Sequence, residues 1–259
     1  TEDSAEASFA GQYESYLNVS GESEIVEKWR RCVASMFTER SVGYHLENGM
    51  HPLDSSIAVV VMKMARSDKA CSGVMFTLDP DSGHDGVIHI SSAYGLGELL
   101  VQGTVSPDSF LVWKAGLLKK KHAIVHRHMG QKEHRMIYAS SGRSDTEIID
   151  IGLDERRTWS LENKEVLALA DMAMRIEQHY GRPMDIEWAK DGLSGELFIV
   201  QARPETVHGK ERTNVLTRYV MDTELMTRLQ RRGKVLATGH AVGERIGAGK
   251  VRVYADYDD

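Results

Sequence analysis

The stretch GRPMDIEWAKDGLSGELFIVQARPET, residues 181–206, predicts two strands joined by a turn, with polar side chains set into apolar runs. Asp185 and Glu187 are two positions apart in the first run, and Gln201 and Arg203 are two apart in the second. Side chains two apart on a strand share a face. If the strands pair antiparallel, one register sets Glu187 opposite Gln201. The same register sets Asp185 opposite Arg203. The residues turned toward a core would then be Ile186, Trp188, Val200 and Ala202.

This polar face would hold two carboxylates, one amide oxygen and one guanidinium. Carboxylate and amide oxygens are hard ligands suited to Mg²⁺, which often shares the phosphate oxygens of a substrate. An arginine provides a planar fork for phosphate oxygens. The face therefore predicts a nucleotide-phosphate site. The alternative is a cross-strand salt bridge between Asp185 and Arg203 beside two exposed polar residues, worth at most about 1 kcal/mol.

Beyond the hairpin, the sequence pattern predicts helices and short strands that do not alternate strictly along the chain. A long helix should begin after Ser160 as its N-cap and end at Gly181. Another helix is expected from Ser23 past Arg40, and one through 215–229. Short apolar runs separated by turn signals predict a mostly antiparallel meander, with strands near 16–19, 55–65, 72–83, 86–98, 108–114, 123–127, 135–139, 146–151 and 233–254. This mixture favours an α+β fold.

Composition narrows the class of protein. The 259 residues are 41% hydrophobic, with a formal net charge of -6 spread along the chain, so no basic surface for nucleic acid is expected. No apolar run approaches the roughly 20 residues that span a bilayer, and no signal peptide is expected. Cys32 and Cys71 are too few for a disulfide framework, which favours a reducing cytosol. The cluster His122, His126 and His128 favours structural or surface roles over a zinc site.

Two other kinds of stretch could contact a nucleotide. The apolar run 59–64, VVVMKM, is either a buried core strand or an adenine-binding hinge that uses its backbone groups. The glycine-containing stretches 8–12 and 93–103 either form turns or bring backbone N–H groups close to phosphates.

Four segments together resemble a known family. SFAGQYESYLNV, RSDKACSGVMFTLDPDSG, SAYGLGELLVQGTVSPD and YGRPMDIEWAKDG followed by LFIVQARPETV occur in this order. Over nearly its whole length the chain resembles the N-terminal nucleotide-binding region of the phosphoenolpyruvate synthase (pyruvate, water dikinase) family. The resemblance implies an ATP-grasp fold, incomplete at its N-terminus, over residues 1–208. Residues 209–259 would be a linker and the start of a swivelling phosphohistidine domain.

The resemblance also implies a reaction and partners. ATP, pyruvate and water would give AMP, phosphoenolpyruvate and phosphate, a phosphotransferase step of gluconeogenesis in the cytoplasm. Phosphoryl groups would pass to a histidine on the swivelling domain and then to pyruvate on a third domain. The implied partners are ATP, Mg²⁺ and those two domains of a longer chain, with no nucleic acid or membrane. A homodimer through the absent domains stays open.

The same resemblance implies roles for individual residues. Glu187 and Gln201 would hold Mg²⁺. Arg203 would contact the ATP phosphates, and Asp185 would support the site and the transfer. Further nucleotide contacts would come from Gly11 and Gln12 in a phosphate-covering loop, Met62 and Met64 in the adenine hinge at 61–64, and Glu98.

Some departures from the family pattern leave alternatives open. Met62 stands where the family has Gln, and the family's Gly-Lys, VRSSA and phosphohistidine motifs are not found. His240 lies near the lead-in to the last motif but in the wrong context, and is not proposed as the acceptor. We therefore expect this chain alone to be inactive. The alternatives are a related dikinase, such as rifampicin phosphotransferase or pyruvate phosphate dikinase, a nucleotide-binding module without turnover, and a structural domain without nucleotide.

Overall fold

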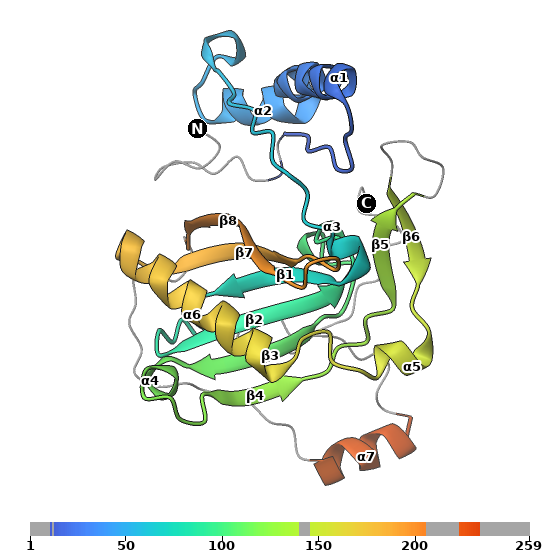
Figure 1. Ribbon diagram of the computed structural model, residues 1–259, viewed down its shortest axis with the longest axis vertical. Coiled ribbons are helices and arrows are strands. Elements are labelled where there is room, and N and C mark those ends of the chain that lie inside the picture. The colour runs from blue at the N-terminus through green and yellow to red at the C-terminus, as the bar shows by residue number, and fades with distance from the viewer. Residues whose placement is uncertain (1–10, 12, 140–145, 206–222, 234–259) are drawn as a thin grey trace.

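A six-stranded antiparallel sheet forms the centre of the molecule, in a computed structural model that describes residues 11, 13–139, 146–205 and 223–233 (Figure 1). In sheet order its strands are β4 (Ile124–His128), β3 (Asp108–Trp113), β2 (Val87–Tyr94), β1 (Cys71–Phe76), β7 (Met184–Lys190) and β8 (Leu197–Pro204). Strands β5 (His134–Tyr138) and β6 (Thr146–Asp150) form a separate antiparallel pair. The predicted α+β class and antiparallel meander are confirmed.

The long helix α6 (Asn163–Tyr180) lies across one face of the sheet (Figure 1). Its buried side includes Val166, Leu169 and Ala173, which belong to the same core cluster as the sheet residues Ile186 and Trp188. Burying a large apolar side chain contributes about 1.5–3 kcal/mol, so this layer supplies much of the folding free energy. The β7–β8 hairpin is therefore fixed to the core by one face.

The ends of α6 confirm one sequence expectation and correct another. Gly181 has a left-handed backbone with φ 67° and ends the helix, as predicted. The predicted N-cap Ser160 was wrong, because Glu162 precedes the helix in a capping box with Glu165. Ser160 is buried instead, and its hydroxyl bonds to residues of the sheet.

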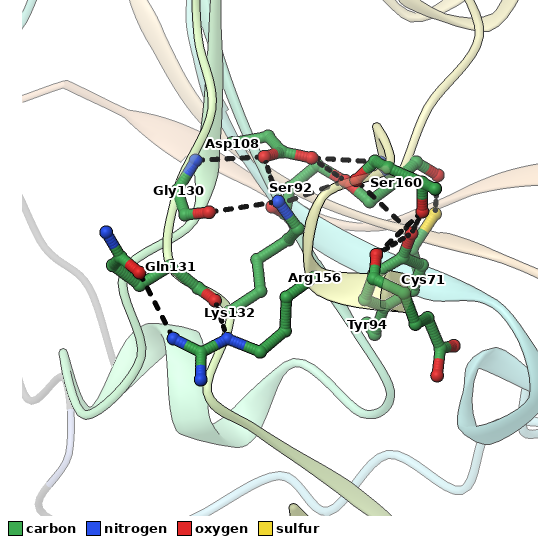
Figure 2. A network of polar contacts seen from close by, with 11 residues as sticks. Cys71, Ser92, Tyr94, Asp108, Gly130, Gln131, Lys132, Arg156 and Ser160 are labelled. Carbon is green, nitrogen blue, oxygen red and sulfur yellow. Dashed lines mark hydrogen bonds and ion pairs between the residues drawn. The ribbon is translucent and has the colours of Figure 1, made fainter. Parts of the chain in front are cut away.

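Those bonds belong to a buried polar network shown in Figure 2. Asp108, at the start of β3, is fully buried and forms an ion pair with Lys132, which is also fully buried. The Asp108 carboxylate also accepts hydrogen bonds from the Gly130 N–H at 3.0 Å and from the Ser160 N–H and hydroxyl at 2.9 and 2.8 Å. The Ser160 and Ser92 hydroxyls are 2.8 Å apart. The network joins β2, β3, the loop after β4 and the loop before α6.

The remaining helices are shorter than α6. They are α1 (Glu22–Ala34), η1 (Ser35–Phe37), α2 (Glu39–Glu47), η2 (Pro52–Asp54), η3 (Ser67–Lys69), α3 (Glu98–Val101), α4 (Lys114–Leu118), α5 (Leu153–Arg156) and α7 (Thr223–Arg231). Within the described residues, no helix has the length and apolar content needed to cross a membrane.

Two expectations about the N-terminal region were wrong. The single helix predicted from Ser23 past Arg40 is divided, because Ser35–Thr38 interrupts it and Thr38 caps α2 by accepting from the Ser41 N–H at 3.3 Å. The strand predicted near residues 16–19 is not formed in the described part of the chain.

The Val-rich run at 55–65 is the largest difference from the sequence expectation. It forms no strand with any residue that the structure describes. Val60 and Val61 are 81% and 65% exposed, so the run is not a buried core strand. Both neighbours of β1 in the sheet are already present as β2 and β7, and apolar composition alone provides no pairing partner. We call residues 55–65 the arm, which leads from α2 and η2 to the sheet (Figure 1).

Some expectations fall outside the described residues. They include the domain division at residue 208, the first part of the helix expected at 215–229 and the strands expected at 233–254. The structure describes α7, Thr223–Arg231, which overlaps the last part of the expected helix and extends two residues past it.

Candidate functional site

The β7–β8 hairpin has the register that the sequence predicted. Asp185 is opposite Arg203, and Glu187 is opposite Gln201. Ile186 is opposite Ala202 on the reverse side, where α6 covers the core. Two-residue periodicity therefore gathers the two carboxylates, the amide and the guanidinium on the face that α6 leaves uncovered.

A β-bulge changes the pairing of the first half of β8. The register shifts after Glu187, so that Trp188 is opposite Ile199 and Val200 is the extra residue. Val200 is 38% exposed, whereas Ile199 packs against the core. The expectation that Val200 faces the core was wrong, because one inserted residue reverses the alternation of faces.

The bulge leaves the Asp185–Arg203 pair intact. The Nε and Nη2 atoms of Arg203 each donate to Oδ2 of Asp185 at 2.8 Å. The Asp185 side chain is 14% exposed and that of Arg203 is 35% exposed. Asp185 therefore fixes the orientation of the guanidinium, while part of Arg203 stays accessible to a ligand.

The same sheet face continues from the hairpin onto β1. Val74 is opposite Glu187, and Phe76 is opposite Asp185. Directly opposite residues on paired strands share a face, so two half-buried apolar side chains lie beside the polar group. Val74 and Phe76 were not predicted as site residues, although alternation along β1 from the buried Met75 would have placed them on this face.

The other predicted nucleotide contacts lie on separate elements. Glu98 is the first residue of α3, is exposed, and accepts from Gln102 Nε2 at 3.0 Å. Met62 is 54% exposed on the arm, and Met64 is half-buried against a second apolar cluster formed by Ala93, Leu96, Leu99, Val105 and Met136. Gly11 has φ 70°, a conformation that glycine adopts readily, and Gln12 lies outside the described residues. The structure thus brings together the four hairpin residues, and it places the rest on other segments.

Comparison with known proteins identifies the family. Residues 1–223 match the family described as pyruvate phosphate dikinase, AMP/ATP-binding domain. The chain belongs to this family.

Individual relatives agree with this assignment. The chain is 46% identical to phosphoenolpyruvate synthase of Escherichia coli K12, over 100% of this chain and 32% of that protein. It is 44% identical to phosphoenolpyruvate synthase of Aquifex aeolicus, over 98% of this chain and 30% of the relative. A probable phosphoenolpyruvate synthase of Archaeoglobus fulgidus is 38% identical over 97% of this chain and 31% of its own length. The chain therefore spans about a third of the length of these relatives.

In this AMP/ATP-binding domain, the donor set at the hairpin fits a magnesium ion. Glu187 is half-buried and Gln201 is exposed, so both can direct oxygens outward from neighbouring strands. A set of two protein oxygens suits Mg²⁺, which completes its octahedron with waters and substrate phosphates. Among the described residues, the hairpin included, no three His, Cys, Asp or Glu side chains gather in a metal-binding group.

The two cysteines of the AMP/ATP-binding domain are both unpaired. Burial raises the pKa of the Cys71 thiol to about 12, and its Sγ donates to the Ser160 carbonyl at 3.2 Å. Burial also raises the pKa of Cys32. A thiol with a raised pKa is a poor nucleophile at neutral pH, so Cys71 is a packing residue.

Proposed function

We propose that this chain is the ATP-binding part of a phosphoenolpyruvate synthase with an ATP-grasp fold. The whole enzyme would convert ATP, pyruvate and water into AMP, phosphoenolpyruvate and phosphate. The observation that carries the proposal is the hairpin register, which sets Glu187 opposite Gln201 beside the Asp185–Arg203 pair in a chain of the AMP/ATP-binding family.

Each hairpin residue has a role in this proposal. Glu187 and Gln201 hold Mg²⁺, which when bound neutralises charge on the phosphates. Arg203 directs a guanidinium N–H toward a phosphate oxygen, and Asp185 keeps the guanidinium oriented through its two 2.8 Å contacts. The half-buried Val74 and Phe76 exclude water from one side of the site. Asp185 and Arg203 are therefore our candidate catalytic residues.

The adenine end of the nucleotide is assigned to the arm. Backbone groups at 61–64, including Met62 and Met64, would bind the base edge, which does not require a glutamine side chain at Met62. Gly11 and Gln12 would cover the phosphates, and Glu98 would lie near the ribose or base. Support for these assignments is the exposure of Met62 and the accessibility of the arm.

Phosphoryl transfer needs mainly positioning and charge neutralisation from a protein. The hairpin would supply both to ATP, and an acceptor histidine and a pyruvate site would lie on further domains of a longer chain. Because the proposal assigns those groups to other domains, we propose that this chain does not turn over by itself. A cytoplasmic location agrees with the unpaired cysteines.

The test is AMP formation by the longer protein that contains this chain. We expect AMP release from ATP and Mg²⁺ to require pyruvate, with phosphoenolpyruvate and phosphate formed in equal amounts. AMP formation that needs rifampicin in place of pyruvate would identify a rifampicin phosphotransferase. AMP formation that consumes phosphate and yields pyrophosphate would identify a pyruvate phosphate dikinase. Either result would contradict the proposal.

A further inference from the structure

One residue joins the arm to the hairpin that carries the candidate site. Arg66 directly follows the arm, and its backbone N–H donates to Asp191 Oδ2 at 3.0 Å. The Arg66 carbonyl accepts from the Gly192 N–H, also at 3.0 Å. Asp191 and Gly192 lie in the turn between β7 and β8. The end of the arm is therefore bonded by its backbone to the tip of the hairpin.

The hairpin tip is itself held in one conformation. Asp191 Oδ1 accepts from the N–H groups of Leu193 and Ser194 at 2.8 and 2.9 Å, which leaves Oδ2 for Arg66. The backbone N–H groups of Arg66, Ser194 and Leu193 lower the pKa of the Asp191 carboxyl. A Cβ atom at Gly192 would lie 2.6 Å from the Lys69 carbonyl oxygen, so the two backbones are in close contact. The segment that follows the arm and the turn of the β7–β8 hairpin are therefore packed rigidly against each other.

The Arg66 side chain adds contacts to two further elements, η3 and β5. Its Nε and Nη2 atoms bond to the two carboxylate oxygens of Asp68, each at 2.8 Å. Its guanidinium carbon lies 4.6 Å from the centre of the Tyr138 ring on β5. The Asp68 side chain is only 6% exposed. A lysine could offer neither the two-point fork nor the planar stack, so the geometry is specific to arginine.

We propose that Arg66 is a positioning residue that sets the distance between the adenine end and the phosphate end of the nucleotide site. This inference rests on the proposed function, in which the arm binds adenine and the hairpin binds phosphates. The arm forms no strand with the described residues, so its position relative to the hairpin depends on the contacts at its end. Arg66 makes those contacts to the hairpin turn, to η3 and to β5 at once.

The experiment compares two ligands that share phosphates and differ in adenine. In the full-length protein, dissociation constants for ATP and for inorganic tripolyphosphate are measured with Mg²⁺, together with KM and kcat. Arg66→Lys should weaken ATP binding and raise the KM for ATP by about tenfold, while tripolyphosphate affinity and kcat change less than about twofold. The matched control is Arg182→Lys, since Arg182 is exposed next to the same hairpin.

Two further variants test the ring contact. Tyr138→Phe keeps the aromatic face under the guanidinium and should retain wild-type ATP affinity. Tyr138→Leu removes that face and should lose affinity for ATP but not for tripolyphosphate. This variant also tests the inference if Arg66→Lys fails to fold. An unchanged KM for ATP in Arg66→Lys and Tyr138→Leu would overturn the inference. Equal losses for ATP and tripolyphosphate would also overturn it, because they would indicate general destabilisation. A wild-type protein that binds neither ligand would instead reject the proposed function on which the inference rests.

Discussion

At the scale of single residues, the polar groups of this chain occupy two different environments. The hairpin group is partly exposed, with Arg203 35% accessible, which suits a site that must receive a ligand. The Asp108–Lys132 pair is fully buried, and hydrogen bonds from Gly130 and Ser160 satisfy the carboxylate. A buried charge requires such compensation, because its desolvation costs several kcal/mol. The buried pair is therefore structural.

This assignment predicts a large effect of removing one partner. Asp108→Asn leaves the Lys132 ammonium buried without a carboxylate, and should lower the free energy of unfolding by about 3–5 kcal/mol. Urea denaturation followed by circular dichroism measures the loss. The control is Glu27→Gln, which breaks the exposed ion pair with Arg31 and should cost less than about 0.5 kcal/mol. Similar losses in the two variants would show that the buried pair has no special structural role.

Residue-level prediction from sequence succeeded where the pattern is local. The pairing of Asp185 with Arg203 followed from strand periodicity and a short connection. Ser160 was assigned as a helix cap because serine is a preferred capping residue, but its partner Asp108 is 52 positions away. A tertiary partner at that separation gives no local signal, so the role of Ser160 could not be read from the sequence.

At the scale of elements, the strands were predictable and their interruptions were not. Short apolar runs separated by turn signals located β1 to β8, although the run at 72–83 extends past the end of β1. The break between α1 and α2 had a local signal in Thr38, a favoured N-cap residue immediately before Glu39. The bulge at Val200 had no local signal and is defined only by the pairing of β8 with β7. The arm resembles a core strand in composition, but its valines are exposed and it has no strand partner among the described residues.

The loop after β4 offers a test at this scale. A Cβ atom added to Gly130 would lie 2.2 Å from the carbonyl oxygens of Ser106 and Pro107, so backbone would have to move. Gly130→Ala should therefore destabilise the fold by about 1–3 kcal/mol. Gly152→Ala is the control, because nothing lies within 4 Å of its added Cβ, and its stability should stay within about 0.5 kcal/mol of wild type. Thermal unfolding of both variants distinguishes them, and an unaffected Gly130→Ala would contradict the close packing of this loop.

At the scale of the whole molecule, the two faces of the sheet have different roles. Helix α6 covers one face and packs on the core (Figure 1). The other face carries the hairpin residues beside Val74 and Phe76. The family was predictable because several long motifs occur in order, and the match over residues 1–223 confirms it. The position of the arm beside the hairpin could not be predicted, because contacts among Arg66, Tyr138 and Asp191 bring together distant parts of the chain.

The central claim is that the hairpin binds a magnesium–nucleotide complex through Glu187. Its most direct test is the ATP affinity of Glu187→Gln in the full-length protein, measured by isothermal titration with Mg²⁺ and again with the metal chelated. The control is Glu196→Gln, which changes an exposed glutamate of the same hairpin. Removal of Mg²⁺ should lower the ATP affinity of the wild type and of this control by at least about tenfold. Glu187→Gln should bind ATP weakly in both conditions and show little response to Mg²⁺. A Glu187→Gln protein with wild-type affinity and wild-type dependence on Mg²⁺ would contradict the account.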